Sequence, residues 1–299
     1  MSTTLTWAIT MTATSSIAHS GITKGTTTLL RRETIIQPDG RPVAVPIISG
    51  NSFRGRLRRI GEELLRDTLD YEGELSLPAA HALRGGGSLA KTSGEPLSGR
   101  RLHELRTLIP HIGVFGCAAG GRIIDGCLQV GKVVPHLAET AHILPGGPPA
   151  QLSAFTSAQI ETYMRHDDSD SHAFTEVLGT HHVDVDPTGT PQLDQLSDNG
   201  GDTSQLMQFH VETLPAGTRF SSWLRLDRAT NIEVAFFHDI LTTFIADGRL
   251  GGRAAIGHGH VFTDLVRTHL AGPAPAEVDW RAPLQDNRDD ALTALRALT

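Results

Sequence analysis

The sequence predicts an α+β fold, in which an antiparallel sheet carries helices on one face and long insertions interrupt the core. Two amphipathic helices support this prediction, because apolar residues recur with helical periodicity at 53–64 and 232–244. Strand-like segments with alternating side chains precede and follow the helices, beginning at residues 5–14. No internal repeat and no clear linker divides the 299 residues, so we expect a single domain over residues 1–299.

The N-terminal segment is expected to form strands and turns. Residues 5–14 are the first predicted strand, and residues 15–33, which are polar and contain glycine, are interpreted as a loop or irregular ribbon. Residues 34–46 predict a β-hairpin, because a Pro38-Asp39-Gly40 turn lies between apolar flanks. The N-terminus has no basic residue before its apolar part, which favours a strand over a signal peptide.

The first predicted helix is amphipathic and basic. Asn51 or Ser52 is its expected N-cap, because a short polar side chain can accept an unpaired backbone N–H. Gly55 and Gly61 each cost roughly 1 kcal/mol relative to alanine inside a helix, which indicates close approach by another backbone or a ligand. The polar faces carry four arginines within six positions, namely Arg54, Arg56, Arg58 and Arg59.

The middle of the chain contains two predicted insertions. Residues 67–106 form the first, and residues 108–115 and 122–135 that follow are strand-like. A Pro-Gly-Gly-Pro-Pro run at 145–149 is a strong break. Residues 155–203 are acidic and poor in core residues, so we interpret them as an extended loop.

The second half returns to regular structure. Residues 207–226 predict two strands around a Pro-Ala-Gly-Thr turn at 215–218, and residues 260–266 predict a last strand. Residues 231–246 predict a helix with Thr230 as N-cap and Glu233 completing a capping box. Beyond residue 271 the chain is rich in proline and aspartate and is expected to pack loosely.

Charge is distributed unevenly along the chain. The net charge of −7 argues against indiscriminate binding to nucleic acid. Residues 1–134, however, carry 16 Lys/Arg against 11 Asp/Glu, whereas the remainder carries 10 against 22. This polarity allows RNA on a basic face and an acidic surface elsewhere. Aromatic residues make up only 5%, so platforms for stacking bases are few.

The cysteines and the hydropathy of the chain indicate where in the cell the protein is expected to lie. Cys117 and Cys127 lack the spacing of a metal pair, and we expect two buried thiols in a reducing cytoplasm, with a disulfide as the alternative. No apolar run approaches the ~18 residues needed to span a membrane. We therefore expect a cytoplasmic protein without a membrane partner.

Arginines and glycines together suggest contact with phosphate. Residues 248–260, here called the glycine loop, contain five glycines, two arginines and two histidines. A helix start with free N–H groups, a row of guanidiniums and a glycine-rich loop can hold a phosphate backbone without reading its bases. The alternative is a solvated amphipathic helix with a basic face.

The histidines allow three further hypotheses. His166 with Asp167 and Asp168, or His181 and His182 with nearby aspartates, are candidate metal ligands. Neither set has helical i, i+4 spacing, so a solvated loop is preferred and no metal is expected. Alternatively, His258 and His260, with His19 as partner, could cleave RNA without metal by activating a 2′-hydroxyl. The third is an unrelated histidine-bearing hydrolase. No motif for a nucleotide cofactor or nucleophile elbow is present, so we assign no catalytic residue and no cofactor.

Three segments resemble the RAMP superfamily of CRISPR-associated proteins. VPIISGNSFRGRLR is similar to the family's IPGSSLKGALR helix start, VETLPAGTRF to its VPAGTxF hairpin, and GRLGGRAAIGHGHV to its glycine-rich loop near the C-terminus. The resemblance implies a ferredoxin-like, RRM-like core. Within the superfamily the chain looks like the backbone subunit, and IETYMRHDDSDS is most similar to the backbone subunit of type IV effector complexes.

The resemblance implies a non-enzymatic subunit that polymerises head to tail along CRISPR guide RNA, beside other subunits, and holds it for pairing with a complementary target nucleic acid. Residues 67–106 would be a finger-like insertion, and residues 155–203 would contain a thumb that reaches a neighbouring subunit's RNA segment. The residues expected to contact RNA are His19, Lys24, Ser49, Asn51, Ser52, Arg54, Arg56, Arg58, Arg59, Met164, Arg165, Gly251, Gly252, Arg253 and His258.

One departure from the family bears on catalysis. Type III relatives cleave target RNA with an aspartate in the loop after the first strand. Here that region reads SGITKGTTTLLRRE, with no aspartate before Asp39. We therefore expect no target cleavage, and the alternative function is a metal-independent RAMP endoribonuclease that processes guide RNA.

Overall fold

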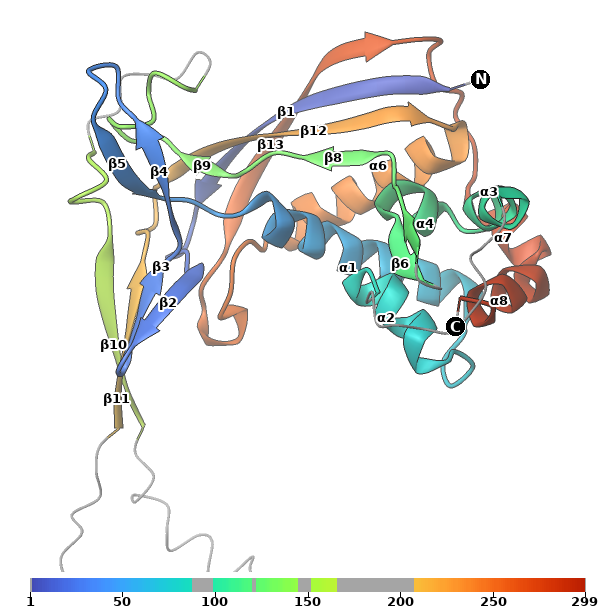
Figure 1. Cartoon of the computed structure of the whole chain (residues 1–299), viewed down its shortest axis with the longest axis horizontal. Helices are drawn as coiled ribbons and strands as arrows, with labels where there is room; N and C mark the ends of the chain where they lie inside the picture. The colour runs from blue at the N-terminus through green and yellow to red at the C-terminus, as the bar shows by residue number, and fades with distance from the viewer. Residues whose placement is uncertain (1, 88–98, 120–121, 145–151, 166–206, 299) are drawn as a thin grey trace, which may run out of the picture.

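The core is a strand–helix–strand–strand–helix–strand unit (Figure 1). The computed structural model describes residues 2–87, 99–119, 122–144, 152–165 and 207–298. The elements of the unit are β1 (Thr3–Ala13), α1 (Gly50–Leu69), β8 (Leu128–Val130) with β9 (Val134–Pro135), β12 (Arg219–Ala229), α6 (Asn231–Asp247) and β13 (Val261–Ala271).

These strands form one antiparallel sheet in the order β13-β1-β12-β8, with β9 also paired to β12. In this order the outer strands belong to different strand–helix–strand halves, which is the ferredoxin-like arrangement. The helices α1 and α6 lie on one face of the sheet in Figure 1. The predicted fold class is therefore confirmed.

The core lies between this sheet and the two helices. Alternate residues of β1, including Leu5, Ile9 and Met11, are buried against the helices. The rings of Phe53 on α1 and Phe244 on α6 pack with centroids 5.3 Å apart. Gly61 explains part of the glycine pattern in α1, because a Cβ there would lie 2.9 Å from the Ile240 side chain of α6.

The boundaries of α6 follow its sequence signals. The Thr230 hydroxyl accepts the Glu233 backbone N–H at 3.3 Å, and the Glu233 carboxylate accepts the Thr230 N–H at 2.8 Å. This is the predicted capping box. The helix ends where Gly248 takes a left-handed conformation with φ of 58°.

A second, smaller sheet lies beside the core sheet. Its order is β10-β11-β3-β2, and β11 runs parallel to β3. The predicted loop at residues 15–33 is thus wrong in part, because it contains two of these strands. The strands are β2 (Ser20–Lys24), β3 (Thr27–Leu30), β10 (Gln159–Arg165) and β11 (Met207–Thr213).

The predicted strands at 207–226 exist, but they do not pair with each other. β11 belongs to the small sheet and β12 to the core sheet, so the expected hairpin is wrong. The chain thus crosses between the two sheets twice, once just after β1 and once between β11 and β12. The two crossings are bonded to each other through Ile17 and Leu214, whose N–H groups each donate to the other's carbonyl at 2.8 and 3.0 Å.

Other predictions near the insertions have mixed outcomes. The hairpin at 34–46 is confirmed as β4 (Arg32–Ile36) and β5 (Pro42–Pro46). The strand at 108–115 is wrong, because Pro110–Phe115 is the helix α4. Short apolar runs cannot separate a buried helix from a strand by periodicity. The same region contains α2 (Leu77–Gly85), α3 (Gly99–Leu108), β6 (Cys117–Ala119) and β7 (Arg122–Ile124).

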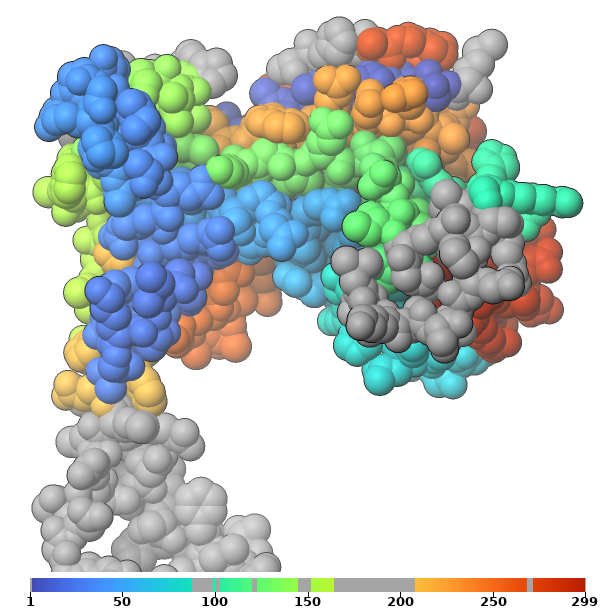
Figure 2. Space-filling view, viewed as in Figure 1, coloured from blue at the N-terminus to red at the C-terminus, as the bar shows by residue number. Residues whose placement is uncertain are grey.

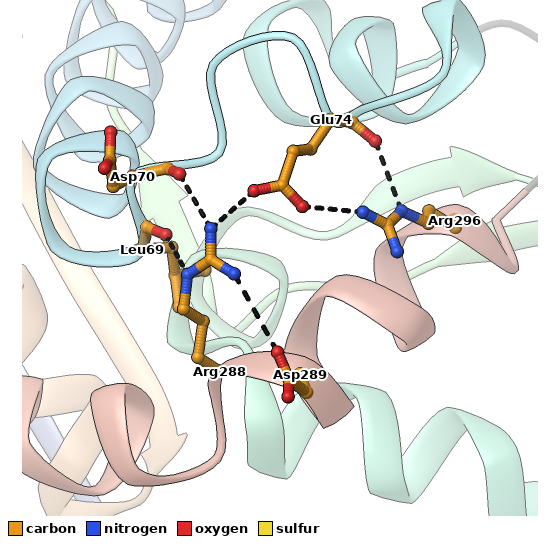
Figure 3. A network of polar contacts seen from close by, with 6 residues as sticks. All are labelled: Leu69, Asp70, Glu74, Arg288, Asp289 and Arg296. Carbon is orange, nitrogen blue, oxygen red and sulfur yellow. Dashed lines mark hydrogen bonds and ion pairs between the residues drawn. The ribbon is translucent and has the colours of Figure 1, made fainter.

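The C-terminal residues do not pack loosely. They form α7 (Arg281–Asp286) and α8 (Arg288–Arg296), and the Trp280 side chain before them is buried. Arg288 donates to the carbonyls of Leu69 and Asp70, and both Arg288 and Arg296 bind the Glu74 carboxylate (Figure 3). The C-terminus is therefore fastened to the end of α1.

Both cysteines are buried free thiols, as expected. Burial raises the pKa of Cys117 to about 11 and that of Cys127 to about 12. Among the helices of the described ranges, none is long and apolar enough to cross a membrane.

Candidate nucleic-acid interface

The start of α1 differs by a few residues from the prediction. Ser49 is the N-cap, and its hydroxyl accepts the Ser52 N–H at 3.2 Å. The helix begins at Gly50, where a Cβ would lie 2.9 Å from the Val130 carbonyl oxygen. Asn51 is left exposed on the first turn, and Ser52 is half-buried.

His19 is positioned at the same place. Its Nε2 accepts the Ser49 backbone N–H at 3.2 Å, so that nitrogen carries no proton. Burial, with a smaller effect from Arg31, lowers the pKa of His19. A neutral His19 therefore supports the cap of α1.

Two of the four helix arginines serve the fold. Arg58 is buried and donates to the carbonyls of Phe115, Gly116 and Ala82 at 2.8, 2.9 and 3.3 Å. Arg54 donates to the same Phe115 carbonyl at 2.5 Å. Their predicted role as phosphate contacts stays a prediction, since backbone carbonyls already engage both guanidiniums. Both arginines hold the C-terminal end of α4 against α1.

Arg56 lies on the opposite flank of α1. It forms an ion pair with Asp247, the last residue of α6, and Asp247 also interacts with Arg249 at 3.4 Å. Because its charge is compensated, Arg56 is a poor candidate for a phosphate contact. It links α1 to the first residues of the glycine loop.

Arg59 is the member of the set that stays available. Within the described ranges it has no hydrogen bond or ion pair with a carboxylate, whereas the neighbouring Arg84 is paired with Glu62 at 2.6 Å. Burial, followed by the charges of Arg56 and Arg84, lowers the pKa of Arg59. The charge of Glu63 acts in the opposite direction, but burial and the two neighbouring arginines outweigh it.

Arg59 lies in a groove of about 750 Å³ between α1, the end of α2 and the β6–β7 hairpin. Figure 2 shows α1 recessed at the centre of the molecule, between the hairpins of the small-sheet side and the β6–β7 side. Arg54 and the edge of Arg58 line the groove, with Asp125 as the acidic residue on its wall. Burial, together with Arg54, lowers the pKa of Arg58 to about 10. The groove therefore carries positive charge that neutral carbonyls do not cancel.

The glycine loop has the backbone conformations that the sequence suggests. Gly251, Gly257 and Gly259 have φ of 85°, 91° and 90°. A Cβ at Gly251 would lie 2.6 Å from the Ala18 carbonyl oxygen, and one at Gly259 would lie 2.5 Å from that of Leu250. The loop is thus packed against the chain after β1, next to His19.

The outer part of this loop is open. Gly251, Gly252 and Arg253 are exposed, and Arg253 begins the short helix η3 (Ala254–Ile256) with a left-handed φ of 60°. Gly252 has an ordinary φ and donates its N–H to Ala18 at 2.7 Å. The backbone conformation at position 252 therefore does not require a glycine.

His258 is placed differently from the prediction. It is 2% exposed, and both ring nitrogens are engaged, Nδ1 with the Ser16 hydroxyl at 2.8 Å and Nε2 with the Tyr163 hydroxyl at 2.6 Å. A buried ring with both nitrogens occupied is unsuited to contact a phosphate or to act as an acid or base on RNA. His260, by contrast, is exposed.

The remaining predicted residues lie on the small sheet. Lys24 is exposed at the end of β2, on the strand at the sheet edge. Met164 and Arg165 end β10, paired with Gln208 and Met207 of β11. The positions of the Met164 and Arg165 side chains, and the acidic histidine-bearing residues 166–203, lie outside what the structure describes.

Sequence reasoning missed several residues of this region. Arg84 and Gly86 at the end of α2 complete the groove, and no local motif announced them. Glu161 and Tyr163 belong to the His258 network, and their alternation on one strand face was visible in the sequence. Across the described ranges, no cluster of three or more His, Cys, Asp or Glu side chains is arranged to hold a metal ion.

Comparisons with known proteins point to one family. The model of the RAMP superfamily matches residues 19–261. A chain of a type IV-B CRISPR complex is 34% identical, with a TM-score of 0.61, covering 94% of this chain and 96% of that one. Csc2 of Thermofilum pendens is 14% identical, with a TM-score of 0.41, covering 99% of this chain and 81% of that one. No curated protein matches the chain.

Proposed function

This chain belongs to the RAMP superfamily, and from that premise we propose that it is the guide-RNA-binding backbone subunit of a type IV CRISPR effector complex. The observation that carries the proposal is the groove beside α1. It combines uncompensated arginine charge with the exposed first turn of a helix, in a chain that matches a type IV-B complex chain over nearly its full length.

The groove suits a phosphate backbone and not a particular base. Among the described residues, no carboxylate forms a hydrogen bond or salt bridge with the Arg59 guanidinium. Asn51 and Ser52 present polar side chains at the helix start. A buried or half-buried charge without a partner is costly, so an anion in the groove is favoured. Phosphate contacts of this kind fix position without reading sequence.

The glycine loop supplies a second contact region. Exposed Gly251 and Gly252 allow close approach of a ligand backbone, and Arg253 adds a charge beside them. Lys24 on β2 extends the basic surface onto the small sheet. The proposed RNA contacts are therefore Lys24, Asn51, Ser52, Arg59, Gly251, Gly252 and Arg253.

The subunit holds RNA without cutting it. Neither His19 nor His258 is free for acid–base chemistry, because the first accepts the Ser49 N–H and the second is buried between two hydroxyls. Of the three candidate histidines of a metal-independent ribonuclease, only His260 is exposed, which leaves that reaction without a partner histidine for acid–base chemistry. The assembly consists of copies arranged head to tail on the guide RNA, with complementary target nucleic acid and other subunits as further partners.

The test is to express the full chain with a repeat-containing guide RNA and measure what co-purifies. RNA of defined length in a helical filament is expected. The affinity of the wild-type protein for unrelated RNAs should fall similarly with rising salt concentration. Each lost phosphate contact should flatten the slope of log affinity against log salt by about 0.7, so the double variant Arg59→Gln and Arg253→Gln should flatten it by about 1.4.

The matched control is Arg228→Gln, because Arg228 is a well exposed arginine (84%) on the core sheet, outside both contact regions. It should leave the salt slope unchanged. A double variant with wild-type affinity and slope would overturn the proposal. Metal-free cleavage of the repeat RNA would instead support the ribonuclease.

A further inference from the structure

The outer part of the glycine loop is exposed along most of its length. Ala254 is half-buried, and the other residues of 251–257 are exposed. Arg253 has a left-handed backbone with φ of 60°, which a residue with a side chain adopts only at a cost. Ordering an exposed segment of this kind also costs conformational entropy. The loop therefore depends on its two ends to hold Arg253 in one place.

His258 fastens one of these ends. Its side chain is 2% exposed, and it is the buried side chain of residues 251–260. Its backbone N–H donates to the Arg253 carbonyl at 3.4 Å, which closes the turn over residues 253–258. The next residue, Gly259, donates its N–H to the Ser16 carbonyl at 2.9 Å. The position of Arg253 therefore follows from the position of His258.

The hydrogen bonds of the His258 ring run in one direction. Tyr163 donates its single hydroxyl hydrogen to Glu161 Oε2 at 2.9 Å, so its oxygen accepts from His258 Nε2 at 2.6 Å. With one ring proton on Nε2, Nδ1 is an acceptor for the Ser16 hydroxyl at 2.8 Å. A neutral ring thus satisfies all three contacts. They require its Nε2–H tautomer.

The far end of this series is held by β10 and β11. The Glu161 carboxylate also accepts the Thr213 hydroxyl of β11 at 2.8 Å and the Gln159 amide at 3.0 Å. The Tyr163 ring packs edge-on against the His258 ring, with centroids 5.9 Å apart. Burial and then Glu161 raise the pKa of Tyr163, and the charge of Arg253 opposes them, which places Arg253 near this cluster.

We propose that Tyr163 is a positioning residue for the glycine loop. It accepts from the Nε2–H tautomer of His258, passes its own hydrogen to Glu161, and so fixes the turn that carries Arg253. By this anchor a strand of the small sheet places Arg253 for contact with RNA, a role that rests on the proposed function. The hydroxyl of Tyr163 itself does not touch the RNA.

The first test reads the tautomer by NMR of the full chain labelled with ¹⁵N-histidine, at pH 8, where histidine is ordinarily neutral. The His258 signals are those lost in His258→Gln. The wild type should carry its proton on Nε2. Tyr163→Phe keeps the ring but removes the partner of Nε2, so the Nδ1–H form, which donates to Ser16, should gain population.

The matched control is Thr162→Val, because it removes a hydroxyl from the opposite face of the same strand, where the bond goes to His210 at 3.1 Å. It should leave the His258 tautomer unchanged. An Nδ1–H tautomer in the wild type would overturn the proposal, and so would the same tautomer in the wild type and in Tyr163→Phe.

The second test is a double-mutant cycle on affinity for a single-stranded RNA. Tyr163→Phe should weaken binding about threefold to tenfold, which is the range of one hydrogen bond of typical net strength. In the Arg253→Gln background it should have no further effect, because the group that it positions is gone. In the Arg59→Gln background it should keep its full effect, because Arg59 lies on α1 and outside the loop.

The anchor and the RNA contact can fail separately. Unchanged affinity in Arg253→Gln, together with a tautomer shift in Tyr163→Phe, would support the anchor and overturn the proposed RNA contact of the loop. Wild-type affinity in Tyr163→Phe, with a loss in Arg253→Gln, would overturn the positioning role. An equal effect of Tyr163→Phe in the wild-type, Arg253→Gln and Arg59→Gln backgrounds would also overturn it, because the residue would then act only on stability.

Discussion

The Arg58 guanidinium lies over the ring of Phe115, 5.3 Å from its centroid, while it donates to the backbone carbonyl of the same residue at 2.8 Å. Phe115 of α4 thus contacts the buried Arg58 guanidinium in two ways, through its ring and through its backbone carbonyl. The arginine therefore organises the wall of the groove next to the half-buried Arg59.

Replacing Arg58 should destabilise the fold. Arg58→Met keeps much of the side chain's length but leaves the carbonyls of Phe115, Gly116 and Ala82 without this donor. An unsatisfied buried polar group costs about 1–3 kcal/mol, so we expect a loss of this order in the free energy of unfolding. Urea denaturation measures it. Arg59→Met is the comparison and should change stability little, because within the described ranges Arg59 loses no hydrogen bond or salt bridge and only a charge interaction with Glu63. Equal losses would contradict this division of roles.

Two adjacent glycines should respond differently to alanine. Gly251 has φ of 85° and a Cβ would lie 2.6 Å from the Ala18 oxygen, whereas Gly252 has an ordinary φ and 3.7 Å of clearance. Gly251→Ala should cost at least about 1–2 kcal/mol, the usual penalty for a left-handed residue with a side chain. Gly252→Ala should be nearly neutral in thermal unfolding. The prediction fails if Gly252→Ala is the more damaging change.

The C-terminal fastening should depend on pH. The hydrogen bond from Arg288, with the charges of Arg288 and Arg296, holds the pKa of Glu74 below its usual value. The contribution of this carboxylate is therefore complete at neutral pH and is lost as pH falls below about 4. Glu74→Gln should lower Tm at pH 7 and lose most of this effect at pH 3. Glu72→Gln, at an exposed neighbour, should have little effect at either pH. A constant Tm difference for Glu74→Gln across pH would argue against the mechanism.

The capping box of α6 gives a stability prediction independent of ligands. Thr230→Ala removes the hydroxyl that accepts the Glu233 N–H and should cost about 0.5–2 kcal/mol. Thr242→Ala is the matched control inside the same helix, because its exposed hydroxyl only bonds back to the His238 carbonyl. Similar free energies of unfolding for the two variants would show that the cap contributes nothing.

Local signals predicted the elements whose determinants are local. The capping box at Thr230, the Pro38-Asp39-Gly40 hairpin and the alternation of β1 all appear where expected. The helix α4 was missed because an apolar run of its length has no decisive period. Burial of Trp280 against α6 was missed because it depends on residues distant in sequence.

The candidate site was harder to read than the fold. Four arginines in one helix look equivalent in sequence, yet the carbonyls of α4 and the carboxylate of Asp247 engage three of them. His258 looked available because the hydroxyl groups that engage its ring belong to Ser16 and Tyr163, which are far along the chain. Which polar residues are free was decided by tertiary contacts, and a single sequence does not contain that information.

The paired crossings between the two sheets have a mechanical consequence. Ile17 and Leu214 bond each other's backbone where the chain enters and leaves the small sheet, and Ala13 bonds Thr218 and Gly217 one step further at 2.9 and 2.7 Å. These four backbone hydrogen bonds restrict rotation of one sheet relative to the other, whereas a single connecting strand would allow it. A force applied to the paired strands β10 and β11 is therefore transmitted as torque to β1 and β12, which are the two central strands of the core sheet.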